Sequence, residues 1–404
     1  MGVIVDLILG IVTSIGGFVE VGSISTSAQA GSEFGFQLLW AVAAAGVMLA
    51  MLVEMSGRLA AVSKRPLAGA VRDRFGIDFQ IIPLSAEFVV DVLLLAAEIG
   101  GAAMAVKLLT GIGFLWWVLP VGAVAWLVLR FLGFGLIEYG IGLLGLVTLC
   151  FVVSAFKLGP SAADLGRSLL PSLPTHDHTR YAFIAVSIIG ATVSPYLLSF
   201  YASGTIEEDM QEKDLWVNTT TSYLGTAFGS VVSMGVLVSS AMVLAPQGIR
   251  VDSFDAAVPM LVPVFGKWAL ALFAVSLGIG CFGAAVEIAL NAGYTFAQVT
   301  GLPWGANKER RNAPAFTRAF TVVLLLSVTV ALLGFDPLRM TSICVALTVV
   351  VMPVLVLPFL VLMNDQRFVG QHVNGPVRNG FLAALTLLGA LLALVVVPLE
   401  ILGG

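Results

Sequence analysis

Runs of about twenty apolar residues, divided by short polar segments, recur along all 404 residues of the chain. A helix of that length crosses the hydrocarbon core of a bilayer. The pattern predicts eleven membrane-spanning helices, and no connecting segment is long enough for a separate domain outside the membrane. The predicted spans are residues 3–29, 36–56, 81–106, 114–130, 136–156, 181–203, 217–245, 268–296, 318–335, 340–363 and 380–402.

The composition excludes most other classes of protein. Hydrophobic residues make up 59% of the chain and charged residues 11%, whereas water-soluble domains have about 45–50% and 25%. Three cysteines lie far apart in apolar runs without a CxxC motif, so a disulfide framework or a cysteine metal cage is not expected. We expect a single membrane domain, residues 1–404, with no cofactor, no nucleic-acid partner and no obligate protein partner.

Lys and Arg residues alternate in number between successive connecting segments. One set of segments carries 13 of them and the other set 7. Since basic residues concentrate on the cytoplasmic side, the chain is expected in the plasma membrane with its N-terminus inside and its C-terminus outside. The first apolar run has no basic segment before it and no small-residue cleavage site, so we expect a retained span rather than a signal peptide.

Two of the predicted spans carry polar and helix-breaking residues at their centres. The first contains GGFVEVGSISTS, residues 16–27, and the sixth contains GATVSPY, residues 190–196. A pair of interrupted spans at corresponding places in two halves is typical of a transporter with a midplane substrate site. The alternative is that the small residues only let helices pack closely. We therefore predict two inverted repeats, residues 3–157 and 180–363, followed by an extra helix at 380–402.

Glu20 is the acidic residue most directly associated with an interruption. It lies beside Gly22, whose backbone freedom would let the helix unwind there. Neither interruption contains His, Cys or Met. Oxygen ligands favour Mg²⁺, Ca²⁺ and Mn²⁺, whereas Fe²⁺, Zn²⁺ and copper favour imidazole or sulfur. The interruptions therefore predict a site for a hard cation.

A second acidic feature lies on the third span. Glu87, Asp91 and Glu98 fall within about 40° of one another on one helix face, at 100° per residue. Ionisable residues inside a membrane are functional hypotheses by default, so this face predicts an aqueous pathway or a proton route. The alternative is a buried network paired with Lys107, Arg130 or backbone donors.

Two other intramembrane acids have structural interpretations. Glu54 precedes Arg58 by four residues, which is the favourable helical order for an ion pair. Glu287 and Asn291 have the same spacing on the eighth span and predict an interhelical hydrogen bond rather than an ion ligand.

Five stretches of the sequence resemble the NRAMP (natural resistance-associated macrophage protein) family of divalent metal transporters. They are FVEVGSISTSAQAGSEFGFQLLW, SGRLAAVSKRPL, GATVSPY, NAPAFTRAF and PFLVLMNDQRFVGQHVNG, and together they cover about residues 8–375 in order. The resemblance implies an all-α polytopic membrane protein with two inverted five-helix repeats, the LeuT-like fold of the amino acid, polyamine and organocation superfamily, and with broken helices 1 and 6.

The family's metal-binding motifs are altered in this chain. Its D-P-G-N motif reads Glu20, Val21, Gly22, Ser23, and its M-P-H motif reads Ser194, Pro195, Tyr196. The carboxylate is kept, the amide becomes a hydroxyl, and the thioether becomes an oxygen. By resemblance the metal ligands are Glu20, Ser23, the carbonyl of Ala191 and Ser194, supported by Gly22, Thr192 and Tyr196.

This chain also has fewer of the residues that carry protons in the family. Of the acidic pair on the third span only Glu98 remains, because Leu95 takes the first position. The two sixth-helix histidine positions are Tyr196 and Tyr201, and the tenth-helix glutamine position is Val351. This pattern is similar to the NRAMP-related branch that transports Mg²⁺.

The sequence thus predicts a transporter of Mg²⁺ or Mn²⁺ that works by alternating access with weak or no proton coupling. One alternative is a proton-coupled importer of Mn²⁺ or Fe²⁺, and another is a transporter of an organic amine or amino acid on the same fold. A sensor that binds the metal without moving it has the same ligands. An intramembrane enzyme is not expected, because the chain has no HExxH or GxSxG motif and no P-loop.

Overall fold

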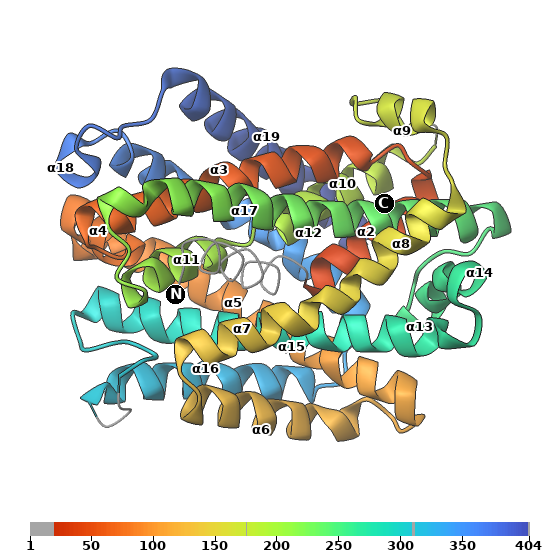
Figure 1. Ribbon diagram of the computed structural model, residues 1–404, viewed down its shortest axis with the longest axis horizontal. Coiled ribbons are helices and arrows are strands. Elements are labelled where there is room, and N and C mark those ends of the chain that lie inside the picture. Colours follow the sequence, from red (N-terminus) through yellow and green to blue (C-terminus); the bar gives the residue numbers. More distant parts are fainter. Residues whose placement is uncertain (1–19, 175, 309–311, 403–404) are drawn as a thin grey trace.

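The structure is a computed structural model that describes residues 20–174, 176–308 and 312–402, and all of its regular elements there are helices. Nine helical segments in these ranges are long and apolar enough to cross a membrane, and Leu115–Phe131 is a shorter apolar helix. Figure 1 shows the long helices lying side by side in one bundle. This arrangement is expected where every backbone polar group must be satisfied within its own helix.

The elements follow the order of the predicted spans. The long helices are α2 (Val21–Phe34), α3 (Leu39–Ser63), α5 (Ile77–Thr110), α6 (Leu115–Phe131), α7 (Phe134–Gly145) with α8 (Leu149–Leu158), α10 (His178–Thr192) with α11 (Pro195–Glu207), α12 (Leu215–Val243), α15 (Ala269–Thr300), α16 (Pro314–Ala331), α17 (Pro337–Leu362) and α19 (Pro376–Leu402). The short helices between them are α4 (Leu67–Phe75), α9 (Ala162–Ser168), α13 (Phe254–Ala257), α14 (Val262–Phe265) and α18 (Gln366–Val369).

The predicted spans are confirmed wherever the structure describes them. Spans two to eleven each coincide with a helix or with two consecutive helices, and residues 21–29 of the first span lie in α2. Residues 3–19 of that span, with Gly16 and Gly17, lie outside the described residues. The connecting residues 57–80 are mostly helical, because α3 continues to Ser63, α4 follows it, and α5 begins at Ile77.

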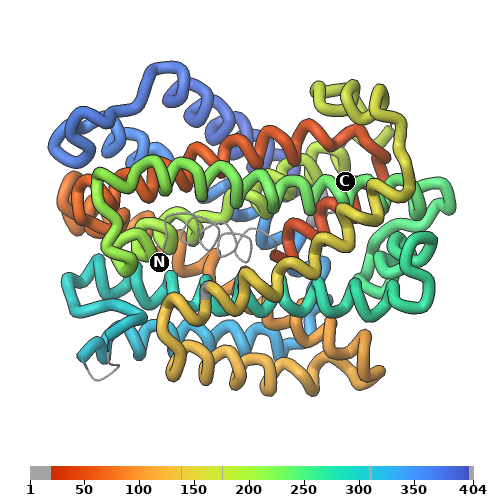
Figure 2. The backbone as a smooth tube through the Cα atoms, viewed as in Figure 1, coloured from red at the N-terminus to blue at the C-terminus, as the bar shows by residue number. Residues whose placement is uncertain are grey.

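The two sets of connecting segments lie at opposite ends of the bundle. Figure 2 shows α4, α18 and the α15–α16 connection at one end, and α9, α13 and α14 at the other. The first end carries the more basic set. There Arg74 reaches Asp365 at 3.0 Å, and the hydrogen bonds from Arg367 hold the pKa of the exposed Asp365 carboxyl well below its usual range.

The ion pair predicted within the second span is confirmed. The guanidinium of Arg58 lies 3.0 Å from the carboxylate of Glu54 on α3. Arg378, at the start of α19, contacts the same carboxylate at 2.5 Å, and Arg58 also donates to the side chain of Asn374 at 2.8 Å. Glu54 is therefore a structural residue that fixes α3 to the segment before α19.

Small residues let the central helices approach closely. A Cβ atom on Gly31 of α2 would lie 2.2 Å from the carbonyl oxygen of Leu237 on α12. A Cβ atom on Gly190 of α10 would lie 1.8 Å from the carbonyl oxygen of Val345 on α17. The packing interpretation of the small residues is therefore correct at these positions, and it operates together with the helix break described next.

Candidate functional site

The sixth span breaks where its sequence requires it to break. Helix α10 ends at Thr192 and α11 begins at Pro195, so Val193 and Ser194 form the interruption. A residue before proline is driven out of the helical region, and Ser194 accordingly has φ −73° and ψ 131°. Since Pro195 has no N–H, the carbonyl of Ala191 has no donor four residues ahead in the chain. The break thus leaves this carbonyl without its helical hydrogen bond, at the position where the family resemblance implies a ligand.

The described part of the first span differs from its prediction. Glu20 is extended, with φ −111° and ψ 174°, and the helix begins directly after it at Val21. The helix is therefore regular at Gly22, where the sequence predicted unwinding, and residues 16–19 of the predicted interruption lie outside the described residues. Ser25 and Thr26 donate their hydroxyls to the carbonyl oxygen of Gly22 at 3.1 Å and 2.8 Å, so these polar side chains are satisfied by their own helix.

Gly22 supports the site through packing rather than through backbone freedom. Its place is inside the first turn of α2, and a Cβ atom there would lie 2.9 Å from Val345 and 3.0 Å from the side chain of Ala191. The missing side chain lets the start of α2 touch the end of α10. This contact brings the two interruptions together.

The carboxylate of Glu20 joins the two interruptions. Its Oε1 accepts a hydrogen bond from the hydroxyl of Ser194 at 3.1 Å, and its Oε2 accepts one from the hydroxyl of Tyr196 at 3.2 Å. Glu20 is 2% exposed, and Ser194 and Tyr196 are fully buried. A carboxylate in this position is the natural counter-charge for a cation.

Ser23, a predicted ligand, and Thr192, a predicted supporting residue, lie within three residues of Glu20 and Ser194 in the sequence. Ser23 is buried in the first turn of α2, and Thr192 ends α10 half-buried. Among the described residues, the side chain of Glu20 is hydrogen-bonded to Ser194 and Tyr196 rather than to Ser23. Tyr196, predicted only as a supporting residue, is a direct partner of the carboxylate.

Glu98 also belongs to this junction. Its Oε2 accepts a hydrogen bond from the backbone N–H of Val21 at 3.3 Å, which places an anion at the positive end of α2. The alternative partners proposed for the third-span acids were wrong in part: Lys107 instead pairs with Asp255 at 3.0 Å. A backbone donor is the partner of Glu98, so the prediction of backbone pairing is correct there.

Glu87 and Asp91 form a separate group about two helical turns away. The side-chain nitrogen of Asn291 on α15 donates to Glu87 at 2.8 Å and to Asp91 at 3.1 Å. The predicted interhelical hydrogen bond of Asn291 is therefore confirmed. The three acids of α5 share a face, as the helical period predicts. Glu98 contacts the start of α2, whereas Glu87 and Asp91 contact Asn291 of α15.

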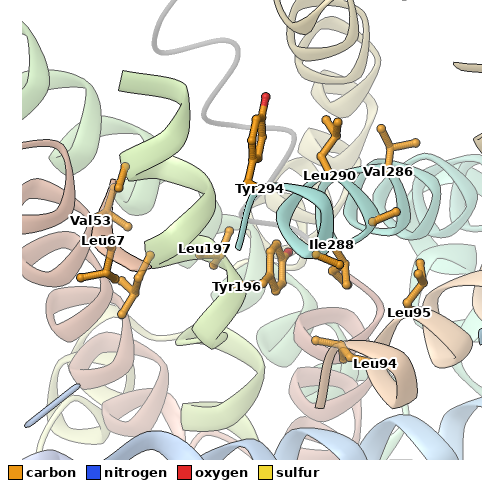
Figure 3. Close-up of a cluster of buried hydrophobic side chains, with 14 of the residues drawn as sticks. Val53, Leu67, Leu94, Leu95, Tyr196, Leu197, Val286, Ile288, Leu290 and Tyr294 are labelled. Atoms are coloured by element: carbon orange, nitrogen blue, oxygen red, sulfur yellow. The ribbon is translucent and has the colours of Figure 1, made fainter. Parts of the chain in front are cut away.

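Sequence reasoning missed the proximity of Glu287 to the site. Glu287 is 4% exposed, its Oε2 has no hydrogen-bond partner among the described residues, and it interacts electrostatically with Glu20 and Glu98. The sequence carries no signal for this proximity. It follows from the contact of Asn291 with Asp91 and from the opposite directions of α5 and α15, which place the acid one turn before Asn291 near the level of Glu98. Figure 3 shows how closely Tyr196 approaches Ile288 on α15.

The junction is surrounded by a tight apolar core. Figure 3 shows Tyr196 near Ile288, with Leu94 and Leu95 of α5 beside them. Leu94, Leu95 and Ile288 are fully buried. Leu95 occupies the position at which the sequence lacks the first acid of the family's third-span pair, so an apolar side chain there packs against the site.

Residues 10–398 match the family described as Natural resistance-associated macrophage protein-like, or Nramp. The chain belongs to the Nramp family. Residues 10–398 include both interruptions and all the site residues named above, so the Nramp resemblance read from the five stretches is confirmed.

Solved structures show the same fold. A manganese transporter of Eremococcus coleocola, in complex with an aromatic bis-isothiourea substituted compound, has 19% identity and a TM-score of 0.77, with 96% of this chain and 85% of that chain covered. Mhp1, a nucleobase-cation-symport-1 family transporter, has 16% sequence identity and a TM-score of 0.64, with 96% of this chain and 91% of that chain covered. MhsT in complex with L-phenylalanine has 13% sequence identity and a TM-score of 0.61, with 96% of this chain and 97% of that chain covered. This Nramp protein therefore has the LeuT-like fold that the sequence predicted.

The junction of the two interruptions in this Nramp protein presents oxygen atoms. It offers one carboxylate from Glu20, the hydroxyls of Ser194 and Tyr196, and the carbonyl of Ala191. Within the described ranges no group of three or more His, Cys, Asp and Glu side chains converges on one point. A bound cation would therefore complete its coordination with hydroxyl, carbonyl and water oxygens, which suits a hard ion.

Proposed function

We propose that this Nramp protein transports a hard divalent cation, Mg²⁺ or Mn²⁺, across the membrane by alternating access. The observation that carries the proposal is the buried carboxylate of Glu20, held between two helix interruptions by the hydroxyls of Ser194 and Tyr196. Midplane sites of secondary transporters are built at such interruptions. The family and the manganese transporter of the same fold support a divalent cation as substrate.

The choice of a hard ion follows from the ligand atoms. Ser194 stands where the family has a methionine, and sulfur is the ligand that favours transition metals over Mg²⁺ and Ca²⁺. Mg²⁺ commonly keeps several of its waters and binds through one or two carboxylates. A site with one carboxylate and several neutral oxygens matches that requirement.

The driving force in this proposal is the membrane potential. Two charges moving through 100 mV gain about 4.6 kcal/mol, which drives accumulation without protons. The proton route of the family is reduced here: Leu95 is buried and apolar, and Tyr201 hydrogen-bonds with Thr221 at 3.1 Å. A proton-coupled Mn²⁺ or Fe²⁺ importer therefore remains the second candidate, not the first.

The direction of transport in this proposal is inward, with α2, α3, α10–α11 and α12 moving against the rest. The more basic end of the bundle is assigned to the cytoplasm by the positive-inside rule. A cavity of about 410 Å³ opens at the other end, and Gln29, Asp336 and Ser342 are among its lining residues. Gln29 lies nine residues beyond Glu20 on α2, so this cavity is the proposed entry to the site.

An organic amine is the less favoured substrate. Aromatic rings often enclose such cations, but the hydroxyl of Tyr196 is bonded to the carboxylate that an ammonium would need. In this arrangement the hydroxyl of Tyr196 orients the carboxylate of Glu20, and the ring does not form part of an aromatic enclosure around a cation.

The proposal is tested by uptake into proteoliposomes at a fixed inside-negative potential. We expect the potential to drive Mg²⁺ uptake and Mn²⁺ to inhibit it. With the potential clamped, a proton ionophore should change the uptake rate by no more than about twofold. Uptake that requires an inward proton gradient would instead establish the coupled importer. Uptake of primary amines with no response to divalent ions would contradict the proposal.

Replacement of Ser194 tests the selectivity of the site. Ser194→Met restores a thioether next to Glu20, so we expect the preference for Mn²⁺ or Cd²⁺ over Mg²⁺ to rise by about tenfold or more. Competition of each ion against Mg²⁺ uptake measures the shift. Ser194→Ala is the control, because it removes the hydroxyl without adding sulfur. Equal selectivity in the Met and Ala variants would remove Ser194 from the ligand set.

A further inference from the structure

Four polar residues follow one face of α5 along most of its length. Gln80, Glu87, Asp91 and Glu98 are spaced by seven, four and seven residues, which keeps them on the same side of a helix. All four are at least nine-tenths buried. Three of them have a buried side-chain oxygen without a hydrogen-bond partner among the described residues: Oε1 of Gln80, Oδ1 of Asp91 and Oε1 of Glu98. Such atoms are costly unless a cation or water meets them.

The middle of this face holds two acids without a basic partner. Glu87 and Asp91 are 4% and 1% exposed, and one amide nitrogen, from Asn291, is the donor that they share. Neither acid takes part in an ion pair among the described residues. Arg58, Arg72 and Arg74 pair with other acidic residues. Two buried carboxylates one turn apart repel each other, so the pair is stabilised by whatever positive charge enters between them.

Two hollows border this pair. Glu87 borders a small cavity of about 20 Å³ that is also lined by Gln80 and Ser199. Glu87 and Asp91 also border a larger, mostly apolar groove of about 660 Å³ between α5, α15 and α16, whose lining includes the exposed side chains of Phe88 and Val322. The smaller cavity is therefore the space from which an ion would reach the pair. Both hollows lie on the side of the pair that leads to the more basic end of the bundle.

We propose that Glu87, Asp91 and Asn291 form a second binding site for the transported hard divalent cation. This inference rests on the proposed function, and it adds a station on the path between the Glu20 site and the cytoplasmic end. The second site lies seven residues along α5 from Glu98, a separation of about 10 Å. We refer to it as the inner site.

Asn291 provides the switch between an empty and an occupied inner site. In the structure its nitrogen faces the two acids and its oxygen faces the hydroxyl of Thr295 at 3.4 Å. A half-turn of the amide exchanges the two atoms, and the hydroxyl of Thr295 accepts as readily as it donates. The ion then has carboxylate oxygens from Glu87 and Asp91 and an amide oxygen from Asn291, which are ligands that Mg²⁺ and Mn²⁺ prefer.

A second station has a physical use in transport. An ion held by a buried carboxylate dissociates slowly. A pathway with several sites lets each site bind the ion strongly enough for entry and weakly enough for release. The inner site offers a second set of anionic oxygens just as the ion gives up Glu20. It therefore lowers the barrier to release toward the cytoplasm.

The test is the number of ions bound to the purified full chain in detergent, measured by equilibrium dialysis with Mn²⁺ and elemental analysis. We expect two ions in the wild type, one in Glu20→Gln, one in Asp91→Asn and none in the double variant. Asp255→Asn, which removes a charge outside the proposed path, is the control and should bind two.

The outcomes separate this inference from the proposed function. One ion in the wild type that Glu20→Gln abolishes overturns the inner site and leaves the Glu20 site standing. Two ions that persist in Asp91→Asn also overturn it, and no binding in the wild type overturns both. Asn291→Asp serves if Asp91→Asn does not fold: added negative charge should tighten the weaker site about tenfold, and an unchanged affinity overturns the proposal.

Discussion

Replacing Glu20 by glutamine is expected to abolish divalent ion uptake. The substitution keeps the size of the side chain. Its amide oxygen still accepts from one of the two hydroxyls, Ser194 or Tyr196, and its amide nitrogen donates to the other. The substitution removes the charge of the carboxylate that contacts both Ser194 and Tyr196 at the junction of the two interruptions. Loss of one partner of a buried charge pair costs about 2–5 kcal/mol, so uptake at a subsaturating ion concentration should fall by about a hundredfold or more.

The measurement is Mg²⁺ or Mn²⁺ uptake into proteoliposomes at a clamped inside-negative potential. Asp255→Asn is the matched control, because it also removes one carboxylate charge but acts on an exposed pair with Lys107. Its uptake should stay within about twofold of the wild type, as expected for an exposed ion pair. Monodisperse size-exclusion profiles establish that the variants fold. Unaltered uptake in a folded Glu20→Gln protein would exclude Glu20 as the principal ligand.

Replacing Gly190 by alanine is expected to have the largest effect on stability. An alanine Cβ would lie 1.8 Å from the carbonyl oxygen of Val345 and 2.7 Å from its carbonyl carbon. These are backbone atoms of α17 and cannot rotate away, so α10 must move. Overpacking in tight cores commonly costs about 1–3 kcal/mol and occasionally more. The carbonyl of Gly190 also accepts from Ser194 at 3.4 Å, so displacement of α10 disturbs the site as well.

Thermal unfolding in detergent measures this effect. The apparent melting temperature of Gly190→Ala should fall by several degrees, and ion uptake should fall with it. Gly140→Ala is the control, since a Cβ atom there meets no heavy atom within 4 Å and the residue lies in α7. Alanine in a helix with open space is neutral or slightly stabilising. Equal melting temperatures for the two variants would contradict the close approach of α10 to α17.

The difference between the two glycines shows the limits of sequence reasoning. Gly140 and Gly190 both lie in helices of the bundle, and nothing in the sequence near them predicts which one a helix crosses closely. The same limit applies to Gly22, which the sequence associated with unwinding and which the structure places in a tight contact with Val345 and Ala191.

The sequence by itself determined the described spans, the basic end of the bundle, the break before Pro195 and the position of Glu20 at the start of a helix. Each of these depends on a local property: the length of an apolar run, the charge of a connecting segment, or the missing N–H of proline. Tertiary structure alone decided that Glu98 binds the N–H of Val21, that Asn291 bridges Glu87 and Asp91, and that Tyr196 bonds to Glu20. These contacts join helices far apart in the chain, and their partners are set by how the helices pack, which helical periodicity within one span does not specify.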